Sequence, residues 1–514
     1  MLRVVALIVA SMALLLIAAC TEAPVPANGN GDPSPDDVTI TVGTTSEPLT
    51  LHPHNTNDRP SARVMRQVYD TLVDQTEALE LIPSLAERWT QVDDVTWDFE
   101  IRPGVTFHDG SPLTASDVVF TLERLRNPTT GAPAAFLLGA IDTIDLVDDM
   151  SVRIVTSAPF APILTHLAQT STAILSERAV TEAGAAYGTT VVVGTGPFRF
   201  VSWDAGSEIV LDRNDDWWRG DVGPKRVVFR ALPDPATRAA QLESSAIDVA
   251  YTLSPVDALR LRDDANITMA EIESLATAYI GFNTQKAPFD DARVRRAINH
   301  AVDVDAIIDE VYQGFASRAK GPLSPQVFGA HPDLEPYAYD PELARALLAE
   351  ADLPDGFSTT IWTNVNPLRE RILEIVGTQL AEVGIDVEVQ VLDFGKYLQD
   401  TAAGEHDMFI LGWTAITADA DYGLYALFHS STFGSGNRTF WSNERVDELL
   451  DLGRSTADPD ERREIYYEAQ EIIAAEAPWI FLNTSTEVNA TRSDVTGFVP
   501  HPAGHHRLFG LGTR

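Results

Sequence analysis

The sequence predicts an α/β protein that is built on sheets and divided into two or three domains. Strand patterns and helix patterns alternate through most of the chain, and this order is typical of α/β units. The roughly 475 residues that follow the N-terminal segment exceed what one hydrophobic core usually supports. No internal period of about 20 to 50 residues is present, which excludes a solenoid of repeats.

Three strands are predicted in the first third of the chain. Residues 38–43 alternate β-branched side chains and end at a glycine. Residues 93–101 and 148–155 each begin with two aspartates and continue with alternating apolar side chains, which predicts a hairpin turn followed by a half-buried strand. Between them, Thr114 is placed to cap a helix that carries Asp117 in its first turn.

Helix signals are cleaner in the second half of the chain. Residues 291–312 place apolar side chains at three- and four-residue steps, which predicts one helix. Asp340 and Asp458 each precede a proline and an acidic first turn. This is the pattern of an N-cap followed by the first helical position, so a helix is expected to begin after each of them.

A helix and two strands complete the predicted α/β units. Residues 367–383 predict a helix that Gly384 ends. Residues 385–391 alternate strictly between apolar and polar side chains, and residues 408–411 form a short apolar run, so both predict strands.

The N-terminal segment indicates the compartment. After Arg3, residues 4–19 form an apolar run whose length suits the hydrophobic region of a signal peptide and is too short for a membrane span. The small residues before Cys20 resemble the bacterial lipobox, and that resemblance assigns a thioether-linked lipid to Cys20. The alternatives are an uncleaved anchor, or an ordinary signal peptide with a chance cysteine. We expect a signal peptide at residues 1–19 and a lipid on Cys20.

A tether is predicted between this lipid and the folded body. Residues 20–37 are rich in proline, glycine, asparagine and aspartate and have no apolar periodicity, which is typical of a flexible linker. Cys20 is the only cysteine of the 514 residues, so no internal disulfide can form.

The charge of the chain excludes one class of partner. The formal net charge is −38, which argues against nucleic acid because its phosphates would be repelled. The acidic excess does not identify a ligand.

No specific catalytic motif is present in the sequence. There is no G-x-S-x-G, H-E-x-x-H, P-loop or C-x-x-C motif, and the glycines at 194 and 196 lack the third glycine of a dinucleotide fingerprint. With 75 acidic residues, a pair of carboxylates spaced for glycoside hydrolysis carries almost no information. We therefore expect a protein that is not an enzyme and needs no cofactor. A secreted hydrolase or peptidase with the same α/β pattern is the alternative.

Two groups of histidines are candidates for a metal site. His52 and His54 flank a proline, while His501, His505 and His506 lie among small residues near the C-terminus. Loop histidines at such spacings are more often solvated than bound to metal, so we expect solvated side chains and no metal.

A series of motifs along the chain resembles one known family. The longest runs from residue 97 to 120 (WDFEIRPGVTFHDGSPLTASDVVF) and follows Glu-Arg-Trp at residues 87–89. Further matches follow in order, at residues 194–198, 282–284, 288–297 and 412–413. Together they resemble the family-5 extracellular solute-binding proteins, the oligopeptide, dipeptide and nickel binding components of ABC importers.

The resemblance implies a clam shell of the periplasmic-binding-protein type, class II, with an extra lobe. Lobe I would combine residues 38–70, 189–282 and 485–514, lobe II would be 71–188, and lobe III would be 283–484. Two lobes would close on a small peptide or similar polar solute, and the protein would deliver that solute to the permease subunits of its importer. We expect a monomer outside the cytoplasm that is held at the membrane by the lipid on Cys20.

The resemblance also directs attention to Trp413 as a ligand-binding residue. In peptide-binding members the matching tryptophan is followed three positions later by an aspartate that holds the ligand's α-ammonium, and Ile416 stands at that place here. A buried ammonium needs a carboxylate, so Asp419 or Asp421 is expected to replace it. Otherwise the ligand has no free amine, and a nickel chelate, an oligosaccharide or an opine-like molecule becomes the alternative. Asp419 and Asp421 as solvated loop acids, and Trp413 as core packing, are the structural alternatives.

Two further residues are weaker candidates for ligand contact. Asn283 belongs to the motif at 282–284. Trp362 lies between the predicted strand at 359–361 and the predicted loop at 363–366. Because that loop precedes a helix N-terminus, it would favour an anionic ligand group.

Overall fold

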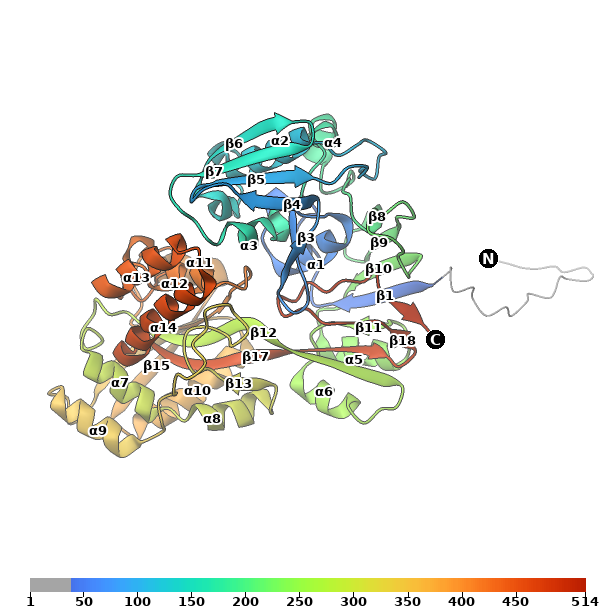
Figure 1. Ribbon diagram of the computed structural model, residues 1–514. Coiled ribbons are helices and arrows are strands. Elements are labelled where there is room, and N and C mark those ends of the chain that lie inside the picture. The colour runs from blue at the N-terminus through green and yellow to red at the C-terminus, as the bar shows by residue number, and fades with distance from the viewer. Residues whose placement is uncertain (1–37) are drawn as a thin grey trace, which may run out of the picture.

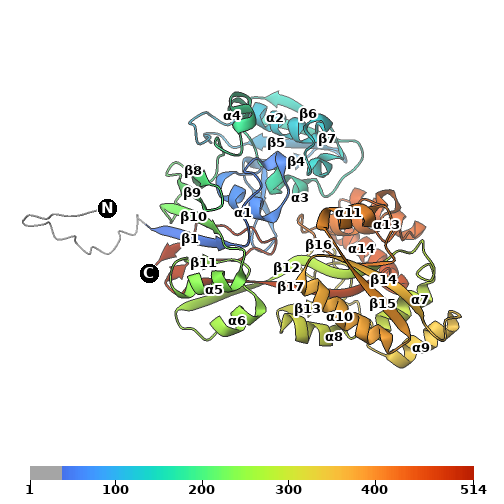
Figure 2. The same cartoon turned by 180° about the vertical axis from the view of Figure 1, so that it is seen from behind.

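The computed structural model describes residues 38–514, which form an α/β protein with one large sheet and one smaller antiparallel sheet (Figure 1). The predicted signal peptide, Cys20 and the tether at 20–37 lie outside the described residues. The ends of the described chain lie on the same side of the molecule, beside β1 and β18, which Figure 1 labels, and Figure 2 shows the same side from behind.

The large sheet has eleven strands and runs through most of the molecule. In hydrogen-bonded order they are β15 (Ile385–Leu392), β14 (Phe357–Asn364), β16 (Met408–Thr414), β12 (Ile267–Phe282), β17 (Trp479–Arg492), β11 (Val249–Ala250), β1 (Thr39–Thr44), β10 (Arg226–Ala231), β9 (Glu208–Arg213) and β8 (Phe198–Asp204), with β13 (Ala316–Arg318) paired to β17 beside this path.

The long strands β12 and β17 connect the two halves of this sheet. They are antiparallel, and their register shifts between Glu273 and Thr277. Before the shift, β12 pairs with the part of β17 that also pairs with β11; after it, β12 pairs with both β17 and β16. The same two strands therefore serve the β1 side and the β14 side of the molecule (Figure 2).

The smaller sheet forms a separate body above the large one (Figure 1). Its antiparallel strands are β4 (Ala86–Gln91), β5 (Thr96–Ile101), β7 (Ser151–Thr156) and β6 (Ile141–Asp148). Two short ladders complete the strands, β2 (Val73–Gln75) with β3 (Leu81–Pro83) and β18 (Val495–Thr496) with β19 (Gly512–Thr513).

Fourteen α-helices are found in residues 38–514. They are α1 (Arg59–Val68), α2 (Ala115–Arg126), α3 (Ile163–Leu167), α4 (Glu177–Ala183), α5 (Pro235–Glu243), α6 (Pro255–Leu261), α7 (Ala292–Ala301), α8 (Val304–Ile307), α9 (Pro341–Glu350), α10 (Pro367–Ala381), α11 (Phe394–Ala402), α12 (Ala420–Phe428), α13 (Glu444–Ser455) and α14 (Pro459–Glu476). The short turns are η2 (Pro53–Asn55), η3 (Pro128–Thr130), η4 (Ala135–Leu138), η5 (Thr170–Thr172), η6 (Gly184–Ala186), the π-helical η7 (Ile308–Tyr312) and η8 (Ser430–Thr432).

Side chains at the helix starts act as the sequence predicts. Asp340 and Asp458 cap α9 and α14 by accepting hydrogen bonds from backbone N–H groups of the first turn. Asp117 accepts hydrogen bonds from the backbone N–H and the hydroxyl of Thr114, both at 3.0 Å, and so holds the start of α2. Gly384 adopts φ +89° after α10, a conformation that glycine takes at little cost.

The prediction of one helix over residues 291–312 is wrong. The segment is broken at Val302, which is extended and fully buried, and Asp303 caps the next helix by accepting from the N–H of Ala306. Burial of Val302 and the new cap outweigh the helical periodicity, so three short pieces replace one helix.

The apolar side chains gather in clusters that draw on different parts of the chain. One combines residues from 38–69, 173–251 and 495–511, and a second lies within residues 72–174. Two more lie within residues 275–503 and share strands of the large sheet. A fifth joins residues near α5 and α6 to β17.

Candidate functional site

Two adjoining cavities lie where the residues of all three expected lobes meet. The first has a volume of about 410 Å³, and the second, of about 190 Å³, shares Asn57 with it. The first is lined by Asn57, Phe136, His166, Trp413, Asp421, Tyr422, Tyr425, Ala426, Thr432, Ser435, Gly436 and Arg454. The second is lined by Asn57, Asp58, Arg59, Ala62, Met65, Gln169, Thr170, Ser171, Thr414, Ile416, Ala503 and His505.

The turn between β16 and α12 places most of the first cavity's wall. Trp413 lies near the end of β16, and the chain then turns through Ala418, which has φ +55°. Helix α12 follows at once, so its first turn presents Asp421 and Tyr422 beside the strand end. The rings of Trp413 and Tyr422 lie 5.2 Å apart, and both line the cavity.

Asp419 is committed to holding the fold. Its carboxylate accepts from the N–H of Asp421 at the start of α12. The guanidinium of Arg462 donates to both carboxylate oxygens, at 2.6 and 2.7 Å, and Asp419 is only 2% exposed. This forked pair occupies the oxygens that a ligand would need, and Asp419 lines neither cavity.

Asp421 faces the first cavity and is also 2% exposed. The Nε of Arg454 lies 2.7 Å from its Oδ1, and the Nε2 of His166 lies 3.9 Å from its Oδ2. Burial raises the pKa of Asp421, although the nearby Arg454 opposes that shift. The guanidinium of Arg454 in turn stacks on the ring of Tyr425, 3.6 Å from its centre.

Trp362 and Asn283 lie away from both cavities. Strand β14 continues to Asn364, so Trp362 lies inside the strand and packs among buried apolar side chains. Asn283 donates from its side-chain amide to the carbonyl oxygens of Gly404 and His406, at 2.9 and 3.1 Å. It therefore fixes the turn that leads into β16.

The expectation of solvated histidines is wrong. His54, His501 and His506 are each at most 1% exposed. His506 Nε2 lies 3.2 Å from Glu487, which also accepts a 2.7 Å hydrogen bond from Arg63. Within residues 38–514 no group of three or more His, Cys, Asp or Glu side chains is arranged to hold a metal ion.

The N-terminal half contributes cavity residues that the sequence pattern did not indicate. Arg59 is the first residue of α1, Asn57 lies two positions before it, and His166 comes from α3. Arg454, in α13, lies 33 residues after the aspartate that it pairs with. None of these four residues belongs to a sequence motif. The cavities form only when distant segments fold against one another, so the local sequence does not indicate which residues line them.

The comparison with known proteins assigns the family. Residues 80–435 match the sequence profile of bacterial extracellular solute-binding proteins, family 5 (middle region). The chain belongs to this family. It is therefore a solute-binding protein of the kind that serves ABC importers outside the cytoplasm, as its motifs predicted, and its α/β fold is of the periplasmic-binding-protein type.

Curated relatives of this family-5 protein match nearly its full length. A glutathione-binding protein, GsiB of Pectobacterium atrosepticum, is 34% identical and covers 91% of this chain and 92% of its own. The dipeptide-binding protein of Escherichia coli is 33% identical, over 86% of this chain and 88% of its own. The heme-binding protein A of Haemophilus influenzae is 32% identical, over 87% of each chain. Proteins of this group bind solutes and are not enzymes.

Solved structures agree with the fold of this family-5 protein. HbpA2 from Haemophilus parasuis has a TM-score of 0.85 and 30% identity, covering 93% of this chain and 100% of its own. The periplasmic binding protein DppA from Helicobacter pylori, in complex with the peptide STSA, has a TM-score of 0.81 and 30% identity, covering 93% and 98%. No helix within residues 38–514 is long and apolar enough to cross a membrane.

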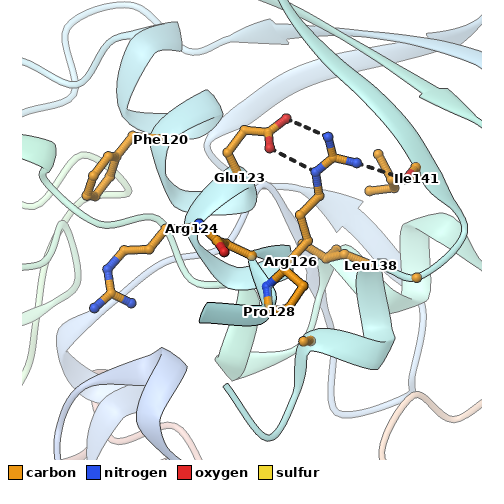
Figure 3. Close-up of a pocket in the computed structure, with 10 residues that line it drawn as sticks. Phe120, Glu123, Arg124, Arg126, Pro128, Leu138 and Ile141 are labelled. Carbon is orange, nitrogen blue, oxygen red and sulfur yellow. Dashed lines mark hydrogen bonds and ion pairs between the residues drawn. The ribbon is translucent and has the colours of Figure 1, made fainter. Parts of the chain in front are cut away.

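A third hollow, of about 750 Å³, lies on the body that carries the smaller sheet (Figure 3). Its wall comes from α2, η4 and the segments beside them. Arg126 in this wall is already paired, because it donates to both carboxylate oxygens of Glu123 and to the carbonyl of Ile141. One body alone lines this hollow, whereas residues of all three expected lobes line the two adjoining cavities.

Proposed function

We propose that this protein captures a small peptide, or a comparable polar solute, between its lobes and passes it to the permease subunits of an ABC importer. The observation that carries the proposal is the pair of adjoining cavities whose walls come from lobes I, II and III. The larger cavity, of about 410 Å³, falls in the range of small-ligand sites, and the smaller one, of about 190 Å³, adjoins it. The relatives named for glutathione and dipeptides support a peptide-like solute.

Within the site we assign ligand contact to Trp413 and Asp421. Both line the first cavity, whereas Asp419 is saturated by Arg462. Ile416 gives the second cavity an apolar wall where a carboxylate would hold an α-ammonium. A nickel chelate, an oligosaccharide or an opine-like molecule is the alternative ligand class. Trp362 and Asn283 line neither cavity, so we assign them no direct part in binding. The protein is not an enzyme and works as a monomer.

The ligand class is tested by a binding panel. Native mass spectrometry of the purified protein, followed by calorimetry, would use trialanine, alanyl-leucine, reduced and oxidised glutathione, heme and the nickel–histidine complex. We expect binding of at least one peptide or glutathione form. Binding of the nickel complex alone would replace the peptide assignment, and turnover of a peptide would contradict the receptor function.

We further propose that a lipid on Cys20 holds the protein at the outer face of a membrane. The support is the small-residue box that ends the N-terminal apolar run. Cys20→Ser is expected to release the protein from the membrane fraction, because the serine hydroxyl does not take the thioether lipid. Detergent phase partition measures this. Equal partition of the parent and the variant would exclude the anchor.

Two of the three lobes are proposed to close over the solute by a hinge. Lobe II and lobe III already touch: the N–H of Ala161 donates to the carbonyl of Arg454 at 2.7 Å, and the rings of Phe136 and Tyr422 stack at 5.7 Å. A solute that adds contacts across this seam favours the closed state. Small-angle scattering should show a smaller radius of gyration when the best member of the panel is saturating. Saturation without compaction would argue for a rigid site.

A further inference from the structure

One buried side chain in the first cavity has an unused hydrogen-bonding atom whose chemical state the structure fixes. His166, in α3 of lobe II, is 4% exposed and lines the cavity. Its Nδ1 lies 2.8 Å from the carbonyl oxygen of Leu137. A carbonyl oxygen can only accept, so Nδ1 carries the hydrogen. In the neutral ring Nε2 is then a bare acceptor.

That acceptor has no hydrogen-bond partner among the described residues. The Oδ2 of Asp421, in lobe III, lies 3.9 Å away. A carboxylate also accepts, so these two atoms cannot bond to each other. Burial keeps the ring neutral by lowering the pKa of His166, against the opposite influence of Asp421 and Asp419 and in the same direction as Arg454.

The Nη2 of Arg454 donates to the same Oδ2 at 3.5 Å, a long hydrogen bond that leaves a lone pair of this oxygen free. A free lone pair on each of two facing acceptors calls for a donor between them. A nitrogen that donates two hydrogen bonds of ordinary length spans acceptors about 4 to 5 Å apart, which is close to the 3.9 Å seen here. Arg454 already balances the charge of Asp421. A ligand group between His166 and Asp421 must therefore donate hydrogen bonds, and it does not have to carry a full positive charge. The aromatic side chains of Trp413, Tyr422 and Phe136 also line this cavity.

We propose that His166 Nε2 and Asp421 Oδ2 form a subsite for a ligand nitrogen that carries two N–H bonds, a primary ammonium or a carboxamide. The inference rests on the proposed function and names the group that the cleft selects. The nitrogen bonds lobe II through His166 and lobe III through Asp421. One ligand atom therefore both confers specificity and joins the two lobes.

The test uses His166→Phe, which keeps a ring against Phe160 but has no acceptor, and His166→Gln, whose amide oxygen restores one. Affinity is measured by calorimetry for trialanine, N-acetyl-trialanine and both forms of glutathione. For each member that the parent binds, His166→Phe should lose about 10- to 100-fold in affinity, because a buried group is left unpaired. His166→Gln should recover most of that loss. His331→Phe, at a lobe III histidine that lines neither cavity, should bind as the parent does.

The acetylated probe separates the two sources of the nitrogen. If the donor is the terminal ammonium, the parent should bind N-acetyl-trialanine more weakly than trialanine. His166→Phe should bind the two peptides with the same affinity. If it is a carboxamide, N-acetyl-trialanine binds weakly because it has no –NH2 group, whereas the same peptide with a C-terminal carboxamide binds the parent and loses affinity in His166→Phe. Nitrogen-15 spectra of histidine-labelled parent protein give a second reading that needs no variant, since the Nε2 resonance should shift when the bound probe saturates.

Parent-like affinity of His166→Phe, or an Nε2 resonance that does not move at saturation, would overturn the subsite and leave the proposed function standing. Failure of the parent to bind any member of the full panel would instead overturn the proposed function, and the subsite with it.

Discussion

Replacing Asp419 with alanine is expected to lower the free energy of unfolding by about 3 to 5 kcal/mol. The change leaves the guanidinium of Arg462, buried in α14, without the carboxylate that accepts two of its hydrogen bonds. It also removes the cap of α12. Urea denaturation followed by circular dichroism measures the loss.

Two controls make the result specific. Asp460→Ala breaks the pair with Arg463 on the same helix, but that aspartate side chain is 92% exposed, so the unfolding midpoint should not move. Asp421→Asn should weaken solute binding more than it weakens the fold, since Arg454 is 30% exposed and can be rehydrated. A stable Asp419→Ala protein with impaired binding would reverse the roles assigned to the two aspartates.

The free energy of unfolding is expected to fall steeply as the pH drops from about 6.5 towards 4. Histidines that are buried and neutral in the folded protein take up protons when the chain unfolds, and this favours the unfolded chain at low pH. Burial lowers the pKa of His108 from 6.5 to about 4. Its Nε2 donates to the carbonyl of Gly196 and its Nδ1 accepts from the N–H of Gly194, so a second ring proton would abolish one of these bonds. His52 and His406 are shifted in the same direction by burial.

The sign follows from the lowered pKa values. Each such histidine is protonated in the unfolded chain below pH 6.5 and stays neutral in the folded one, so its contribution is complete above 6.5 and is lost as the pH falls. His108 alone accounts for about 3 kcal/mol by pH 4. Below pH 4.5 the loss continues at Glu487: burial alone would raise its pKa, but Arg63 and His506 hold it well below its usual range. The raised pKa of Asp421 acts in the opposite direction.

Calorimetric melting at pH 7.5, 6.5, 5.5 and 4.5 checks the acid response. His108→Gln should melt lower than the parent at pH 7.5 and show a shallower dependence on pH, whereas His331→Gln, partly exposed beside Glu471, should keep the parent's slope. A melting temperature that stays level between pH 7.5 and 4.5 would contradict the account.

Local patterns predicted most of the secondary structure, because caps and periodicity act over a few residues. Asp340, Asp458 and Gly384 mark real helix ends. The failure at Val302 came from burial by other segments, which no window of sequence contains. The same limit explains the solvated reading of His54 and His501, since a histidine in a polar loop is buried only when a distant segment covers it.

The candidate site divides along the same line. Trp413 directly follows the motif glycine at 412, and Asp421 lies nine positions after that glycine. The resemblance to the family could therefore indicate both residues, and both line the first cavity. The fate of Asp419 depends on Arg462, 43 residues later, and the role proposed for His166 depends on contact between two lobes. Neither relation leaves a trace in local sequence.

The pairing of β12 with β17 also bears on the order in which the chain can mature after synthesis. A chain that crosses a membrane with its N-terminus first delivers residues 71–188 as one continuous stretch, and these already hold a core of their own. By contrast, β1 waits for β10 and β11, and β11 and β12 wait for β17. The core that includes Ile40 closes only when Leu508 and Leu511 arrive. The fold therefore stays incomplete until residues as late as Leu511 have been exported, and a chain cut short before 479 presents unpaired strand edges to proteases and to other chains.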